Sequence, residues 1–195
     1  MSIYALKSRF QAILRPLVSG LYAIGVTANQ VTLFACVVSI AVAVIVWRGP
    51  RWTFLLIPGW MLLRMALNAI DGMLAREFAQ KSRFGAYLNE LSDVISDAAL
   101  YLPFGMYFGW AATTATIFAA AVSEMTGVLG LMVGASRRYD GPMGKSDRAF
   151  VFSLMAIWIF VINPLPWVMW IVCALTVLTI LNRVRAGLRE SATLA

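Results

Sequence analysis

The sequence predicts an all-α integral membrane protein, a bundle of six transmembrane helices behind an N-terminal amphipathic helix at the membrane interface. Its 195 residues are 61% hydrophobic and only 13% charged, and the mean hydropathy is +0.80. Soluble domains are typically ~45–50% apolar and ~25% charged, so the composition alone indicates a membrane protein. At roughly 20 residues per span, the chain has room for about six helices and no separate soluble domain.

The first 26 residues form a segment of their own, which we separate from a membrane domain over residues 27–195. Lys7, Arg9 and Arg15 alternate with apolar residues at three- and four-residue steps, a pattern typical of a helix lying in the headgroup layer. We expect no cleaved signal peptide, because no compact charged region, short apolar core and cleavage site follow one another. Thr27 or Asn29 is expected to cap the first transmembrane helix.

Six apolar segments follow this start. They lie at about 30–47, 52–75, 86–108, 112–135, 148–162 and 165–182. Pro164 and Pro166 make the last connection a tight one. Cys36 and Cys173 lie inside apolar segments, so we expect them to pack in the bundle rather than to form a disulfide.

The basic residues predict the orientation in the membrane. Thirteen of them lie in the N-terminal helix, the 76–85 loop, the 136–148 loop and the tail after residue 182: Lys7, Arg9, Arg15, Arg76, Lys81, Arg83, Arg137, Arg138, Lys145, Arg148, Arg183, Arg185 and Arg189. The alternate loops hold two, Arg48 and Arg51. This bias places both termini on the cytoplasmic side of a bacterial-type inner membrane. It also accounts for the net charge of +7 through topology and anionic lipid, with no nucleic-acid partner.

The second and third apolar segments carry an unusual polar cluster. One stripe of each helix holds it: Asn68 and Asp71 on the second, and Asn89, Asp93 and Asp97 on the third. An ionisable group at membrane depth costs at least ~2.5 kcal/mol, so such a cluster needs a compensating partner. A turn near Gly85 would bring the stripes face to face, and their oxygens suit a hard cation such as Mg²⁺. The chain has no histidine, which leaves carboxylates as the acid–base groups.

Neighbouring residues give the cluster the character of a ligand site. Gly72 and Ala75 let a ligand approach the helix, and Arg76 offers a fork of donors to a phosphate. The alternative is a hydrogen-bonded knot that only holds the two helices together. Arg64 lies near the middle of its segment, and we expect it to pair with a carboxylate, for which Glu124 is the candidate.

The cluster resembles the signature of the CDP-alcohol phosphotransferases, D-x-x-D-G-x-x-A-R-x8-G-x-x-x-D-x-x-x-D. Six positions match with all spacings kept: Asp71, Gly72, Ala75, Arg76, Gly85 and Asp93. Asn68 and Asn89 stand where the family has its first and third aspartates. These two exchanges remove two negative charges, which Asp97 and Glu90 could restore, although neither is a position of the family signature.

The resemblance implies a membrane enzyme of phospholipid biosynthesis that moves a phosphatidyl group from a CDP-linked lipid donor to a small alcohol and releases CMP. It implies one or two Mg²⁺ or Mn²⁺ ions held at the signature positions Asn68, Asp71, Asn89 and Asp93. We add Asp97 as a further metal ligand, because it lies on the same helix stripe one turn beyond Asp93. The resemblance further implies Asp93 as the base, donor contacts at Gly72, Ala75, Arg76 and Gly85, and a homodimer. We expect glycerol 3-phosphate as the acceptor, its phosphate being held by a pocket of Arg137, Arg138, Lys145 and Arg148.

Two other functions remain open at this stage. The Asn68 and Asn89 exchanges would also fit a degenerate family member that binds nucleotide or lipid without turnover. A small transporter is less favoured, because the charges gather at one side of the membrane rather than along a path between two halves.

Overall fold

The computed structural model describes the backbone of residues 3–194 and the side chains of residues 10–193. Every regular element in that part of the chain is helical. In order, they are α1 (Ile3–Ala23), α2 (Ala28–Arg48), η1 (Arg51–Leu55), α3 (Leu56–Glu77), α4 (Arg83–Tyr101), η2 (Leu102–Phe104), α5 (Gly105–Phe108), α6 (Trp110–Leu129), η3 (Gly130–Val133), α7 (Lys145–Val161) and α8 (Val168–Leu194). The η elements are short 3₁₀ turns.

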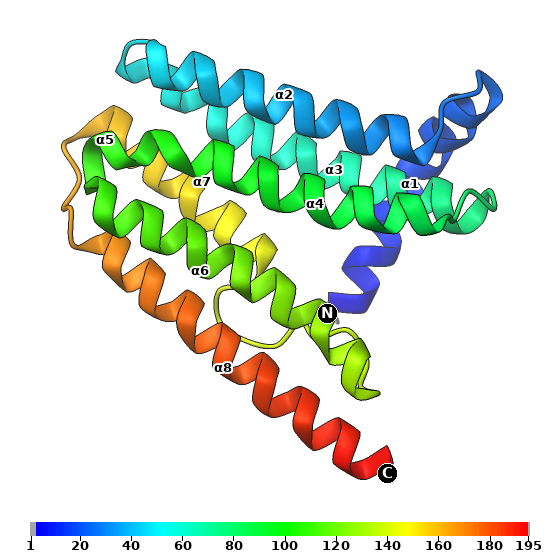
Figure 1. The fold of residues 1–195 in the computed structure, drawn as a ribbon. Coiled ribbons are helices and arrows are strands. Elements are labelled where there is room, and N and C mark those ends of the chain that lie inside the picture. The colour runs from blue at the N-terminus through cyan, green and yellow to red at the C-terminus, as the bar shows by residue number, and fades with distance from the viewer. Residues whose placement is uncertain (1–2, 195) are drawn as a thin grey trace.

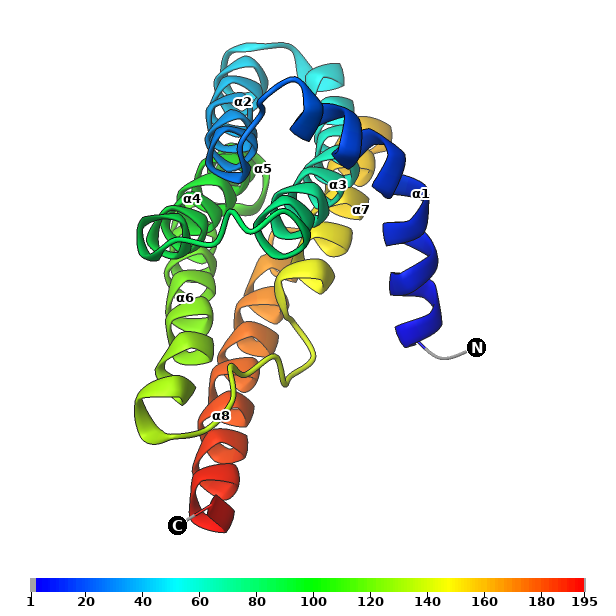
Figure 2. The ribbon, with the colours of Figure 1, turned by 90° about the vertical axis from the view of Figure 1, so that its right-hand side faces the viewer.

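The helices form a long bundle in which α2 packs against both α3 and α4 (Figure 1). On one side of α2, α4 packs against α6, and α6 packs against α8. On the other side, α3 packs against α7. Figure 2 shows α4, α6 and α8 descending together while α3 and α7 lie across from them. Since α3 and α4 both rest on α2, their facing surfaces are free to border a cavity.

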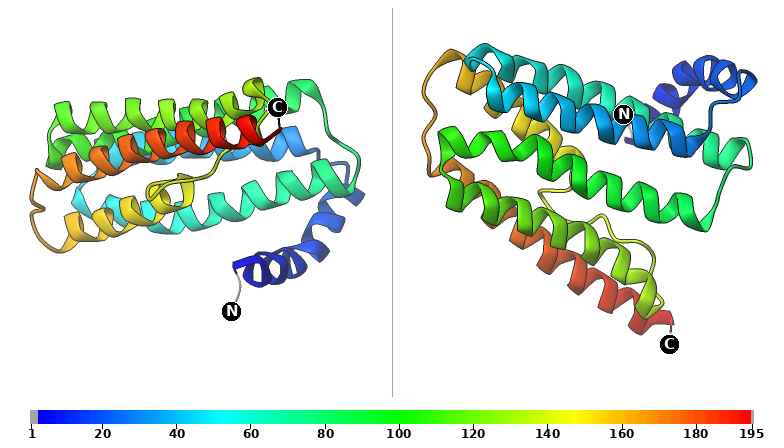
Figure 3. Two further views of the ribbon diagram at one scale, coloured as in Figure 1. Left: turned by 90° about the horizontal axis from the view of Figure 1, so that it is seen from below. Right: turned by 45° about the horizontal axis from the view of Figure 1, so that its top comes forward.

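The connections alternate between the two ends of the bundle, as the loop charges predict. The α1–α2 and α3–α4 connections and the C-terminus lie at one end, and the α2–α3 and α7–α8 connections lie at the other (Figure 3). The connection from η3 to α7 leaves the first of these ends and runs back along the bundle to its middle, where α7 begins. This return carries basic residues into the interior.

Aromatic packing closes the end of the bundle that lacks these basic connections. The rings of Tyr101 and Phe152 stack with centroids 3.7 Å apart, and Phe104 meets Phe152 edge to face. Phe54 and Phe108 complete this core, and all five side chains are buried. Large apolar side chains also cover the outside of the bundle, as expected where lipid is the solvent.

Each predicted apolar segment corresponds to a long helix. Four of them are long and apolar enough to cross a membrane, namely α2, η1 with α3, α6 with η3, and α8, so the chain is a multi-pass membrane protein. The other two are α4, which carries four charged residues, and α7, which has 17 residues. Six spans therefore remain a prediction.

Two predicted boundaries are wrong. The segment expected at 86–108 is not one helix, because Pro103 lies in the 3₁₀ turn η2 that ends α4. A positive φ of 86° at Gly109 then turns the chain into α6. The last helix does not end near residue 182 but continues to Leu194, because polar contacts hold its final turns against the bundle: Arg183 is buried beside Glu124, and Glu190 binds Ser136 and Arg138.

The start of the chain folds largely as expected. Thr27 caps α2, and its side chain accepts a bond of 3.3 Å from the backbone of Gln30, whose side chain bonds back to the Thr27 backbone. The α1 helix packs against α3 through Leu14, Val18 and Leu21. Its location at the membrane surface stays a prediction, and the side chains of Lys7 and Arg9 lie outside the described residues.

Candidate active site

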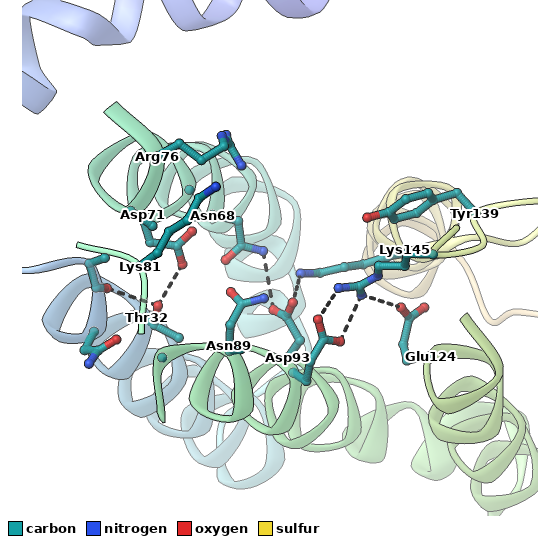
Figure 4. A pocket seen from close by; sticks show the side chains of 18 of the residues that line it. Thr32, Asn68, Asp71, Arg76, Lys81, Asn89, Asp93, Glu124, Tyr139 and Lys145 are labelled. Atoms are coloured by element: carbon teal, nitrogen blue, oxygen red, sulfur yellow. Dashed lines mark hydrogen bonds and ion pairs between the residues drawn. The ribbon is translucent and has the colours of Figure 1, made fainter. Parts of the chain in front are cut away.

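A cavity of about 710 Å³ opens among the start of α2, the end of α3, and the starts of α4 and α7 (Figure 4). Every predicted site residue except Asp97 lines it: Asn68, Asp71, Gly72, Ala75, Arg76, Gly85, Asn89 and Asp93. The two polar stripes therefore face one shared space, as their spacing predicts. They do so across the cavity, because α2 holds α3 and α4 apart.

The α3 side of the cavity presents Asp71. This carboxylate is buried, and it accepts a hydrogen bond of 2.8 Å from the hydroxyl of Thr32 on α2. Sequence reasoning did not single out Thr32 for the site. The sequence feature that could have identified Thr32 is its position one turn into the first apolar helix, on the face that packs against α3.

At the mouth, the Arg76 side chain folds back over Gly72. A Cβ atom at position 72 would lie 3.1 Å from the terminal nitrogens of Arg76, so the glycine leaves room for the guanidinium. Arg76 forms no ion pair with any described residue. Its charge is thus available to an anionic ligand.

The α3–α4 connection is held tightly against the start of α2. Ser82 caps α4 by accepting a bond of 2.9 Å from the backbone of Gly85, and Gln80 accepts one of 2.7 Å from the backbone of Ala28. A Cβ atom at Gly85 would lie 2.8 Å from Asn29 Oδ1. Gly85 is therefore needed for close approach of the helices rather than for the turn itself, which lies at residues 78–82.

Asp93 lies on the α4 side and is surrounded by donors. Lys145 Nζ is 2.5 Å from its Oδ2, Arg64 is 3.2 Å from its Oδ1, and the Asn68 amide nitrogen is 3.4 Å from the same Oδ1. Figure 4 shows Lys145 reaching across from α7 to this carboxylate. Asn89, one turn earlier on α4, lies between Asp93 and the mouth.

Asp97 lies behind the cavity wall and not in the lining. It is 5% exposed, and its two oxygens are bound by Arg64 and, at 3.3 Å, by Arg148. This arrangement differs from the metal-ligand role expected for Asp97, because both oxygens already have partners. The four-residue spacing places Asp97 on the right face of α4 but one turn too deep.

The partner expected for Arg64 was also wrong. Arg64 binds Asp97 and Asp93, whereas Glu124 binds Arg148 at 2.8 Å and Arg183 at 3.5 Å. Both Arg64 and Glu124 are buried, so each does pair within the bundle as membrane depth requires. Which carboxylate meets which arginine depends on helix rotation, which the sequence does not give.

The 134–144 loop forms the remaining wall. Arg137 lines the cavity, binds Glu90 at 2.9 Å and lies over the Tyr139 ring. Arg138 binds Asp140 at 2.9 Å and holds the pKa of that carboxyl below its usual range. Of the four residues expected to form a phosphate pocket, Arg137 and Lys145 line the cavity, while Arg138 points to Asp140 and Arg148 is fully buried. Arg183 lines it in their place.

The donor set does not fit a pair of divalent cations. No group of three or more acidic, cysteine or histidine side chains comes close enough to hold a metal among the residues that the structure describes. Asp93 is engaged by cationic side chains, and Asn68 turns its amide nitrogen toward it. Asp71 remains as one carboxylate that the amide oxygens of Asn68 and Asn89 could supplement, which suits at most one cation.

Comparison with known proteins gives relatives over nearly the whole chain. The inner membrane protein YnbA of Escherichia coli K12 is 41% identical over 202 residues, which cover 98% of this chain and 99% of that protein. A phosphatidylinositol phosphate synthase of Mycobacteroides abscessus is 26% identical over 198 residues, which cover 92% of this chain and 86% of that enzyme.

Solved structures share the fold. The phosphatidylinositol phosphate synthase of Mycobacterium tuberculosis with CDP-DAG bound has a TM-score of 0.74 at 24% identity, and the match covers 90% of this chain and 94% of that one. The same synthase in complex with manganese and citrate gives a TM-score of 0.72 at 23% identity over 88% and 87% of the two chains. The sequence profile of the CDP-alcohol phosphatidyltransferases matches residues 25–180. The chain therefore belongs to the CDP-alcohol phosphatidyltransferase family.

Proposed function

We propose that this protein transfers a phosphatidyl group from a CDP-linked lipid, such as CDP-diacylglycerol, to a small alcohol and releases CMP. The observation that carries the proposal is the convergence of eight predicted site residues on one cavity, with Arg76 at the mouth and Asp93 deeper inside. The family and the synthase relatives support the same reaction class.

In the proposed reaction the hydroxyl oxygen of the acceptor attacks the phosphorus that carries the diacylglycerol. A new oxygen–phosphorus bond forms, the bond from that phosphorus to the oxygen of CMP breaks, and the hydroxyl proton passes to Asp93. Arg76 and Lys145 offset the negative charge of the diphosphate and of the departing CMP. Such transfers depend mainly on positioning and charge neutralisation, which fixed cationic side chains supply.

We propose a phosphorylated alcohol as the acceptor. Arg137, Lys145 and Arg183 line one side of the cavity, and cations grouped in this way suit a phosphate. Several relatives are phosphatidylinositol phosphate synthases, so inositol phosphate takes the first place among acceptors. Glycerol 3-phosphate, expected from the sequence, receives no support from these relatives and becomes the second compound to test.

The same proposal sets the location of the site. The positive-inside rule applied to the basic connections places the cavity mouth and both termini on the cytoplasmic side, where a nucleotide-linked donor and CMP are accessible. A homodimer and a divalent cation at Asp71, either Mg²⁺ or Mn²⁺, also belong to this proposal. The cation would add positive charge beside the diphosphate.

The test is CMP release by purified protein supplied with CDP-diacylglycerol, Mn²⁺ or Mg²⁺, and a panel of acceptors that includes inositol phosphate and glycerol 3-phosphate. We expect release with at least one phosphorylated acceptor, loss of release in Asp93→Ala, and normal release in Glu77→Gln. Glu77 is a suitable control because it pairs with Arg15 outside the cavity. Release equal to that of Asp93→Ala with every acceptor would contradict the enzymatic proposal.

That negative result would favour the second candidate, a family member that binds the donor without turnover. Asn68 and Asn89 are the observation behind it, since two of the four signature carboxylates are absent. Binding of CDP-diacylglycerol without CMP release, measured on the same preparation, distinguishes the two.

A further inference from the structure

Asp93 is the signature carboxylate with the most positive surroundings. Its Oδ2 lies 2.5 Å from Lys145 Nζ, and its Oδ1 lies 3.2 Å from Arg64. Two unit positive charges therefore contact one carboxylate, and together they equal the charge of one divalent cation. We propose that Arg64 and Lys145 take the place of a divalent cation at Asp93, so that this site binds at most one metal ion.

Arg64 is a fixed part of this arrangement. Arg64 is 4% exposed, and its guanidinium joins Asp97 to Asp93, while Arg148 binds Asp97 from the other side. An arginine stays protonated under all ordinary conditions. A permanent positive charge therefore lies just behind the cavity lining, one helical turn from Asn68 along α3.

Lys145 supplies the second charge from a different element. It is the first residue of α7, and the returning 134–144 loop delivers it to the middle of the bundle. Its side chain is 30% exposed, and its ammonium group sits on a flexible stem. Lys145 can thus stay with Asp93 or follow a phosphate, which a bound metal held by several ligands does less readily.

The two asparagines fit the same interpretation. Asn68 directs its amide nitrogen to Asp93 at 3.4 Å, because its carbonyl oxygen would be repelled by the carboxylate. Asn68 therefore acts as a donor to Asp93 rather than as a second ligand beside it. With Asn89 also neutral, a metal ion at Asp93 would meet one carboxylate and two cations. Like charges this close together repel, which disfavours metal at this position.

The inference rests on the proposed function only for the role of the two positive charges of Arg64 and Lys145. Its test does not require turnover. Bound Mn²⁺ is counted by electron paramagnetic resonance on purified protein, with Mn²⁺ alone and with added CDP. We expect at most one ion per chain in the wild type. In Lys145→Gln we expect Mn²⁺ affinity to rise about tenfold, since a competing charge is removed, and a lysine with a merely structural role would give no such gain.

Arg83→Gln is the matched control. It removes one positive charge from the start of α4, but Arg83 is exposed and does not line the cavity, so we expect unchanged Mn²⁺ affinity. The Asn68→Asp/Asn89→Asp variant provides a second route if Lys145→Gln does not fold, and it too should gain affinity. Two Mn²⁺ per wild-type chain, or no gain in any folded variant, overturns the inference.

The CMP assay is read separately. Absence of CMP release together with the expected Mn²⁺ results would contradict the proposed function and support the replacement of a metal by Arg64 and Lys145. CMP release together with two bound Mn²⁺ ions would support the proposed function and contradict that replacement.

Discussion

Two clusters of charged residues lie next to each other in this bundle, and they differ in how completely their groups are paired. In one cluster, Asp97 behind the cavity wall and Glu124 at its edge have arginine partners. Arg148 contacts both carboxylates and also donates a hydrogen bond of 3.1 Å to the Met143 carbonyl. In the cavity, Asp71 has one side-chain donor, Thr32, and Arg76 has no ionic partner among the described residues.

Under the proposed function, the paired groups hold the helices together and the groups that face the cavity without an ionic partner bind the ligand. A buried charge without a partner is costly, so a fully paired network contributes to holding helices in place. A charge that faces a cavity without a partner keeps its interaction for a ligand. Asp93 belongs to both clusters, because Arg64 connects it to Asp97 and Lys145 connects it to the cavity.

The largest effect should come from Asp93→Asn. The substitution keeps the shape of the side chain but removes its ability to take a proton, and general-base groups typically contribute 10²- to 10⁴-fold in rate. We expect CMP release to fall by about 10³-fold while the protein stays folded in detergent. A variant that retains wild-type release would show that Asp93 belongs with the structural cluster alone.

Arg148→Met should act on stability instead. Removing one partner of a buried ion pair typically costs ~3–5 kcal/mol, because the remaining charge is left uncompensated. We expect a loss near the lower limit, about 3 kcal/mol in the free energy of unfolding, since Arg64 and Arg183 still reach Asp97 and Glu124. Denaturant titration in micelles measures it. Arg185→Met, at an exposed position of the same bundle, should leave the unfolding curve unchanged, and equal curves for both variants would contradict the assignment.

Gly85→Ala should have a smaller effect, at the start of α4 where this helix approaches α2. The added methyl group would lie 2.8 Å from Asn29 Oδ1, so α4 must shift away from α2, and overpacking of this kind costs ~1–3 kcal/mol. Gly59→Ala is the control, because no atom lies within 4 Å of a Cβ built there. We expect a lower midpoint of thermal unfolding for Gly85→Ala than for Gly59→Ala, and the reverse order would count against close approach at Gly85.

The smallest effect is expected for Arg15→Gln. Arg15 and Glu77 form an exposed ion pair at 3.1 Å between α1 and α3, and exposed pairs of this kind are screened by water and salt. The unfolding midpoint should not change measurably. A clear decrease would show that α1 contributes more to the bundle than its apolar contacts indicate.

Much of the site follows from the sequence because helical spacing is local. The four-residue steps from Asn89 to Asp93, and the signature spacing from Asp71 to Arg76, place these side chains on single faces of α3 and α4, and the structure brings them to one cavity. The cap at Thr27 follows from an equally local pattern.

The ion pairs between residues on different helices could not be predicted from the sequence. Glu124 was expected to meet Arg64 because both lie within apolar segments, but α6 turns Glu124 toward α7 and α8, where Arg148 and Arg183 bind it. The ion pair between Lys145 and Asp93 could not be predicted either, because it depends on a loop that returns into the bundle. Depth and rotation of helices are set by the packing of the whole chain.

The order of residues in the buried network matters during synthesis. Glu124 leaves the ribosome before Arg148 and Arg183, the residues that neutralise it. Until α7 and α8 follow, the early helices carry an acidic group at membrane depth without its arginines, which is unfavourable in lipid. The first helices therefore gain their final stability only when the last helix arrives, and a chain interrupted before residue 145 lacks Lys145 as well as the two arginines, Arg148 and Arg183, that bind Glu124.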